Sequence, residues 1–191
     1  SPGDHGAPGG GATAQWIADL RTTAEFQDDR ASVKVVYLGD GNNVSNSLAN
    51  ICARMGANVV VCTPAELGPP QWAMAEAKEL AARSGGKAEF MNDAAAAVRD
   101  ADFLYTDVWF SMGQQRNPEK QKQLESYRID ALLLAQAGPD CRVMHCLPAH
   151  RDEEIAADVI DGPRSIVFQQ AENRLHVQKE LLKMLLGDAQ A

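Results

Sequence analysis

Short apolar segments that alternate with helix-like segments constrain this chain more than any other feature. The segments that we read as strands are 33–38, 58–62, 88–91, 102–106, 142–146 and 165–168. Continuous apolar strands are typical of a parallel sheet that is buried on both faces, with helices as the covering layers. The sequence therefore predicts an α/β fold: a doubly wound parallel sheet in three α/β/α layers, Rossmann-like.

The intervening segments place apolar residues at helical spacing. The expected helices are 15–26, 44–55, 71–83, 93–100, 118–126, 130–137, 152–160 and 172–186. Residues 1–14 start with a stretch rich in Gly and Pro, which indicates a flexible tail or linker. We therefore expect one α/β domain over 15–187, including its flanking N- and C-terminal helices, and a short tail over 188–191.

Charge and cysteine content limit the classes of partner. Eighteen basic and 26 acidic side chains give a net charge of −8, which argues against nucleic acid or an anionic membrane as the main partner. No apolar run approaches the ~20 residues that span a bilayer. Four cysteines without a secretory signal segment indicate free thiols in a reducing, cytoplasmic environment.

Polar motifs follow the predicted strands at their carboxyl ends. They lie at 40–43, 107–113 and 145–151, with Glu172-Asn173-Arg174 shortly behind the sixth predicted strand. The carboxyl ends of parallel strands share one edge of the sheet, where ligands bind in open α/β folds. We therefore expect these segments to converge on one crevice.

The first motif, Gly39-Asp40-Gly41, resembles a dinucleotide-binding turn only in part. Val44 stands where the third glycine is needed, and Cys62 rather than an acidic residue ends the second strand. A nicotinamide cofactor is therefore not expected. The amides of Asn42 and Asn43 suit an anionic group such as a carboxylate, although one of them could simply cap the helix.

The second motif combines an anion, a hydroxyl and backbone amides within one turn. Asp107 and Ser111 suit an amino acid, whose ammonium and carboxylate groups need partners of both kinds. In the alternative interpretation these two residues cap the next helix, while Trp109 and Met112 belong to the core.

The third motif holds soft metal ligands and a candidate nucleophile. Its neighbourhood contains Cys141, His145, Cys146 and His150. His145 and Cys146 are adjacent on a strand and point to opposite faces, so we expect no metal site. Cys146 is either a nucleophile with a histidine base or a small apolar residue. Arg174 could neutralise an oxyanion, or pair with Glu172 at the surface.

Together these motifs resemble ornithine carbamoyltransferase. The resemblance rests on Gly39-Asp40-Gly41-Asn42-Asn43, Asp107-Val108-Trp109, Ser111-Met112-Gly113, His145-Cys146-Leu147-Pro148-Ala149-His150-Arg151 and Glu172-Asn173-Arg174-Leu175-His176, in that family's order and with similar spacing. It covers about residues 15–186. Members of this family transfer a carbamoyl group from carbamoyl phosphate to ornithine, giving citrulline, with no metal or organic cofactor.

The resemblance implies roles for single residues. The implied catalytic residues are Asp107, Cys146 and Arg174, and the implied substrate-binding residues are Asn42, Asn43, Asp107, Ser111, Met112, His145, Cys146, Leu147 and Arg174. Asn43 would hold the ornithine carboxylate, and Asp107 with Ser111 the α-amino group. Cys146 and Leu147 would face the side-chain amine, and Arg174 would polarise the carbamoyl oxygen.

Motifs of the family's first domain have no counterpart in this sequence. No segment matches its Ser-x-Arg-Thr phosphate loop. The resemblance therefore implies an ornithine-binding domain that joins carbamoyl transfer when a phosphate-binding half is supplied, within a homo-oligomer or a hetero-complex. The alternative is a non-catalytic or repurposed protein that uses the same pocket for ornithine or an analogue.

Overall fold

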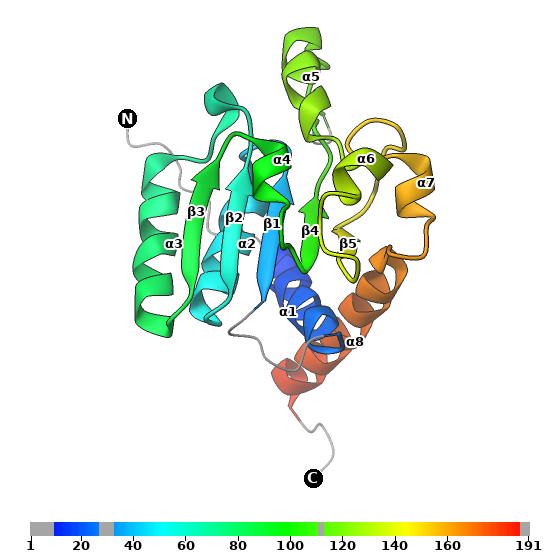
Figure 1. Ribbon diagram of the computed structural model, residues 1–191. Helices are drawn as coiled ribbons and strands as arrows, with labels where there is room; N and C mark the ends of the chain where they lie inside the picture. The colour runs from blue at the N-terminus through cyan, green and yellow to red at the C-terminus, as the bar shows by residue number, and fades with distance from the viewer. Residues whose placement is uncertain (1–9, 27–32, 111–112, 188–191) are drawn as a thin grey trace.

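The computed structural model describes residues 10–26, 33–110 and 113–187 and contains one parallel sheet (Figure 1). The strands are β1 Lys34–Leu38, β2 Asn58–Cys62, β3 Lys87–Met91, β4 Phe103–Thr106 and β5 Arg142–His145. They lie in the order β3-β2-β1-β4-β5, with Val36 opposite both Val60 and Leu104. The predicted doubly wound parallel sheet is confirmed.

Helices cover both faces of this sheet. In chain order the described helices are α1 Gly10–Ala24, α2 Asn43–Arg54, α3 Gln71–Ser84, α4 Ala94–Ala97, α5 Pro118–Leu124, α6 Ala131–Leu134, α7 Ala157–Ile160 and α8 Val167–Leu186, with 3₁₀ turns at Ala65–Leu67 and Glu125–Tyr127. Helix α5 lies beyond the strand ends and not on a face of the sheet (Figure 1). Helices α2 and α3 bury one face, around Tyr37 and Tyr105. Helices α4, α6 and α7 bury the other, around Leu38 and Leu104, which gives three layers (Figure 1).

The turn between β1 and α2 depends on two residues. The Asn42 side-chain oxygen accepts hydrogen bonds from the backbone N–H groups of Val44 (2.9 Å) and Ser45 (3.2 Å), so it caps α2. A Cβ atom at Gly41 would overlap the backbone carbonyl oxygen of Leu67. A side chain at position 41 is therefore excluded by this close backbone approach.

The prediction of a sixth strand over 165–168 is wrong. Only an isolated bridge joins Ser165 to Val143, and α8 starts at Val167. A short apolar run fits a strand or a helix equally well from its pattern alone. This segment forms a helix because Val167, Gln170 and Val177 lie at helical spacing and together form a buried face of α8.

Several predicted helix boundaries also change. Of the helix expected over 152–160, only α7 forms, because the preceding residues make a turn in which the Asp152 N–H donates to the Ile155 carbonyl oxygen (2.7 Å). Helix α1 starts at Gly10, inside the expected tail. The remaining tail residues, 1–9 and 188–191, lie outside the described residues, and the domain limits stay a prediction.

Candidate functional site

The candidate site lies where the direction of strand order reverses. After β1 the chain builds outward through β2 and β3, and β4 then returns to the opposite side of β1. Open α/β sheets bind ligands at this switch point, beyond the carboxyl ends of the strands. Asn42, just after β1, and Asp107, just after β4, meet there: Asn42 Nδ2 donates to Asp107 Oδ2 (3.1 Å).

A third strand end reaches the same carboxylate. Cys146, which follows β5, donates its thiol hydrogen to Asp107 Oδ1 (2.9 Å). Burial, and next the charge of Asp107, raise the pKa of the Cys146 thiol well above 9.0. At neutral pH Cys146 is therefore a thiol that donates a hydrogen bond, which disfavours the alternative of a cysteine nucleophile.

Asp107 is the centre of this arrangement. Its side chain accepts one hydrogen bond on each oxygen and is nearly buried, with the residue 7% exposed. A carboxylate in such a partly dry position attracts an ammonium group more strongly than one in water. The arrangement suits the binding of an amine.

A basic side chain, which the sequence analysis did not single out, lies beside this site. Lys120 of α5 binds Asp40 Oδ2 (2.8 Å) and lies 5.4 Å from the centre of the Phe110 ring. These contacts tie α5 to the turn after β1. No local pattern could have indicated this pair, since its members are 80 residues apart.

His145 organises the loop after β5. Its Nδ1 accepts a hydrogen bond from the Leu147 N–H (2.9 Å), so its Nε2 carries the proton and donates to Glu154 Oε1 (3.1 Å). Its backbone N–H donates to Gln170 Oε1 (2.9 Å). Leu147 has a φ of +54°, which is unfavourable for a side chain of this kind. His145 therefore holds a strained loop residue next to the site.

Other residues that we expected at the site are not joined to it by these contacts. Asn43 is exposed on the first turn of α2. Arg174 lies half-buried on α8, where burial raises the pKa of Asp19 and the charge of Arg174 only opposes that rise. The strand that was expected to bring Arg174 to the sheet edge does not form. Ser111 and Met112 lie outside the described residues.

Asp19 joins α1, β4 and α8 beneath this loop. Its Oδ1 accepts hydrogen bonds from Gln15 Nε2 (2.7 Å) and Gln170 Nε2 (2.6 Å), and its Oδ2 accepts one from the Tyr105 hydroxyl (2.9 Å). Because Gln170 also bonds the His145 N–H, this network fixes the end of β5. Neither Asp19 nor Gln170 was among the site residues predicted from the sequence.

The Asp19 carboxyl gives stability an unusual pH dependence. Burial raises its pKa from 3.8 to about 6, although its hydrogen bonds oppose the shift. The native chain therefore holds a proton near pH 5 that the unfolded chain releases, so this stabilisation is full at low pH and is lost as pH rises through 6. From pH 4 to pH 7, we expect the free energy of unfolding to fall by about 2 kcal/mol less in Asp19→Asn than in the unsubstituted protein. Urea denaturation at both pH values measures this, and parallel curves for the two proteins would contradict it.

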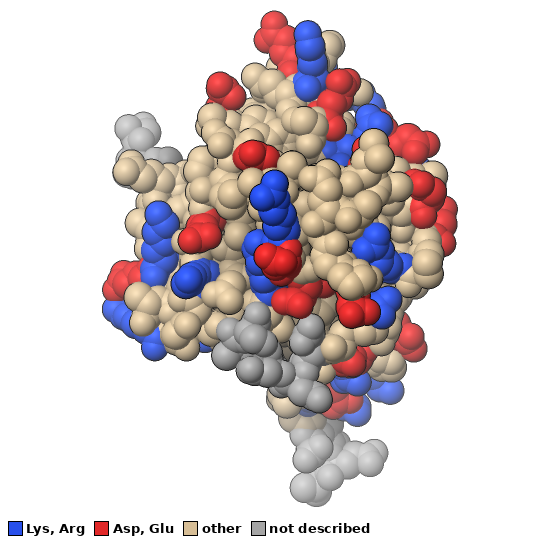
Figure 2. All heavy atoms as spheres, in the orientation of Figure 1, with Lys and Arg blue, Asp and Glu red and all other residues tan. Residues whose placement is uncertain are grey.

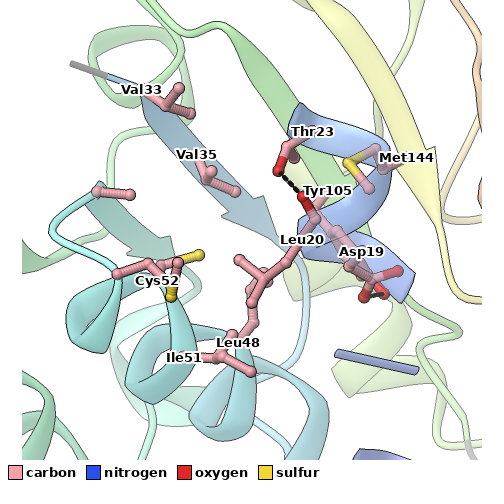
Figure 3. A pocket seen from close by; sticks show the side chains of 12 residues that line it. Asp19, Leu20, Thr23, Val33, Val35, Leu48, Ile51, Cys52, Tyr105 and Met144 are labelled. Carbon is pink, nitrogen blue, oxygen red and sulfur yellow. Dashed lines mark hydrogen bonds between the residues drawn. The ribbon is translucent and has the colours of Figure 1, made fainter. Parts of the chain in front are cut away.

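The cavity beside Asp19 is not an amino-acid site. It has a volume of about 30 Å³, and most of its lining is apolar. Figure 3 shows Leu20 of α1 pointing across it toward Leu48 and Ile51 of α2. Such a space has room for about one water molecule.

Of the four metal-ligating residues considered from the sequence, only His150 belongs to the group of possible ligands that come together among the described residues. The members of this group are His150, Glu153 and Glu154. His145 and Cys146 instead bind Glu154 and Asp107, in agreement with their predicted opposite directions.

The surface carries charges of both signs. On the face shown in Figure 2, Lys and Arg side chains are interspersed with Asp and Glu, and no broad basic patch is visible there. None of the helices in the described part of the chain has the length and apolarity of a membrane span.

Comparison with known proteins identifies relatives of this site and fold. Residues 31–185 match the family described as aspartate/ornithine carbamoyltransferase, Asp/Orn binding domain. The ornithine carbamoyltransferase of Pyrococcus abyssi is 47% identical over 174 residues, which are 91% of this chain and 55% of that protein. That of Bacillus subtilis is 47% identical over 175 residues, covering 90% and 54%. The chain spans about half the length of these relatives.

Solved structures agree in fold. The ornithine carbamoyltransferase from Pyrococcus furiosus superposes with a TM-score of 0.84 at 48% identity, over 88% of this chain and 54% of that one. That from Gloeobacter violaceus gives 0.83 at 42% identity, over 91% and 58%. An acetylornithine transcarbamylase, solved in complex with acetylcitrulline, gives 0.78 at 28% identity, over 92% and 56%.

Proposed function

The chain belongs to the aspartate/ornithine carbamoyltransferase family, and we propose that it supplies the ornithine-binding part of a carbamoyltransferase. One observation carries the proposal: the Asp107 carboxylate accepts hydrogen bonds from Asn42 and Cys146 at the switch point of the sheet. Three separate strand ends thereby present polar groups to one place where an amino acid can bind.

In this proposal Asp107 attracts an ammonium group of ornithine, together with Ser111. Asn43 binds the carboxylate of the ligand, and Cys146 and Leu147 face its side-chain amine. That amine attacks the carbamoyl carbon only without its extra proton, and an amine of this type has a pKa near 10.4. Holding it neutral at pH 7 requires about 5 kcal/mol from its surroundings. The Asp107 carboxylate can contribute by accepting the proton, and the polar groups around it by orienting the amine.

We propose that the carbamoyl phosphate site is completed by a phosphate-binding half, with Arg174 polarising the carbamoyl oxygen. The matched part covers only 55% and 54% of the length of the two relatives named above. The large apolar side chains exposed on α8 and α1 include Leu175, Leu182, Leu185, Leu186 and Ile17. Exposed apolar side chains of this number favour a covering partner, either another copy or a separate polypeptide. The proposed location in the cytoplasm rests instead on the interpretation of the four cysteines as free thiols.

Calorimetry with ornithine and an assay for citrulline test the proposal. We expect ornithine to bind the chain, and citrulline to form from carbamoyl phosphate only when a phosphate-binding half is added. Binding without citrulline formation in that mixture would favour the alternative of a binding protein. Tighter binding of N-acetylornithine than of ornithine would indicate N-acetylornithine as the substrate, in line with the acetylornithine transcarbamylase named above. Binding of neither amino acid would reject the proposal.

A further inference from the structure

The turn that follows the candidate site brings three metal-ligating side chains together. One ligand atom from each of His150, Glu153 and Glu154 lies within 4.8 Å of the other two. Backbone contacts fix this geometry: the Glu153 N–H donates to the His150 carbonyl oxygen (3.1 Å), and the His150 N–H donates to Glu154 Oε1 (2.6 Å). The ligand atoms are therefore close before any ion binds.

One buried oxygen in this cluster has no hydrogen-bond partner. Glu154 is 0% exposed, and its Oε1 accepts from both His145 and the His150 N–H. Its Oε2 accepts no hydrogen bond and lies 3.9 Å from His150 Nδ1, too far for one. Buried carboxylate oxygens are rarely left without a partner. Zinc binds nitrogen and oxygen ligands at about 2.0–2.2 Å, so one cation between these two atoms would satisfy both.

We propose that His150, Glu153 and Glu154 bind a divalent first-row transition-metal ion, with Zn²⁺ as the reference. One imidazole and two carboxylates are typical ligands for such an ion, and three protein ligands leave a position for water. The proposal rests on these contacts and is independent of ornithine binding.

Arg116 competes for one of the ligands. Its Nη1 lies 2.7 Å from Glu153 Oε1, and its side chain is 57% exposed. Exposed ion pairs of this kind are weak, so a doubly charged cation can displace the guanidinium. Removing Arg116 should therefore increase the affinity for Zn²⁺, an effect opposite to that of removing a ligand.

Calorimetric titration of the folded chain with Zn²⁺ tests the proposal. We expect His150→Gln and Glu153→Gln each to weaken binding at least about tenfold, and Arg116→Ala to strengthen it. His176→Gln is the matched control, because His176 lies 3.7 Å from Glu172 on an exposed helix face. This control should leave the affinity unchanged.

The thiol of Cys146 is the main competing zinc ligand nearby, and two results separate it from the proposed site. Cys146→Ser should leave Zn²⁺ affinity in place, and bound Co²⁺ should show no thiolate-to-metal absorption. Loss of binding in Cys146→Ser, an affinity insensitive to His150→Gln, or an equal loss in His176→Gln would each overturn the proposal.

Discussion

Replacing Glu154 by alanine is expected to lower the free energy of unfolding by roughly 3 kcal/mol, as measured by urea denaturation in a buffer that contains a metal chelator. The carboxylate accepts hydrogen bonds from His145 Nε2 (3.1 Å) and from the His150 N–H (2.6 Å). Without it the buried His145 donor has no partner, and an unsatisfied buried donor costs about 1–3 kcal/mol. Loss of this anchor also frees the ring that holds Leu147.

The neighbouring Glu153 provides the control for this prediction. Glu153 is also a glutamate and directly precedes Glu154, but it pairs with the exposed side chain of Arg116. We expect Glu153→Ala to cost less than about 1 kcal/mol. Glu154→Gln should fall between the two, because its amide oxygen can still accept a hydrogen bond. Equal losses for Glu154→Ala and Glu153→Ala would show that the buried contacts contribute little.

The sequence predicted the convergence of the site because strand ends are easy to locate. The predicted strands end shortly before Asp40, before Asp107 and at Cys146, and parallel strands must place these ends along one edge. The hydrogen bonds of Asp107 to Asn42 and Cys146 confirm that arrangement. The cap formed by Asn42 was also anticipated as an alternative role, and in the structure Asn42 caps α2 while its Nδ2 donates to Asp107.

The sequence could not predict the groups that support the site. Glu154 stands in Asp152-Glu153-Glu154, a pattern typical of an exposed helix start, yet it is fully buried under His145. Gln170 lay between the predicted strand over 165–168 and the predicted helix over 172–186, and its role depends on the start of α8 at Val167. Such partners are set by tertiary packing between distant segments, which local periodicity does not contain.

Asp107→Asn is expected to weaken ornithine binding by at least about 30-fold, the smallest loss typical of a buried charge pair that loses one partner. The substitution keeps the shape of the side chain and an oxygen that accepts a hydrogen bond from Asn42 or Cys146. It removes the negative charge that faces the ammonium group of the ligand. The loss therefore reports the charge of Asp107 rather than collapse of the site, and calorimetry with ornithine measures it.

Asp161→Asn is the matched control for Asp107→Asn, because it removes one carboxylate charge from an exposed ion pair with Arg151. We expect it to change ornithine affinity by less than about twofold, since exposed charges far from a ligand are screened by salt. Unchanged binding in Asp107→Asn, with the fold intact by circular dichroism, would remove Asp107 from the ammonium site. Equal weakening in both variants would assign the effect to the overall charge of the protein.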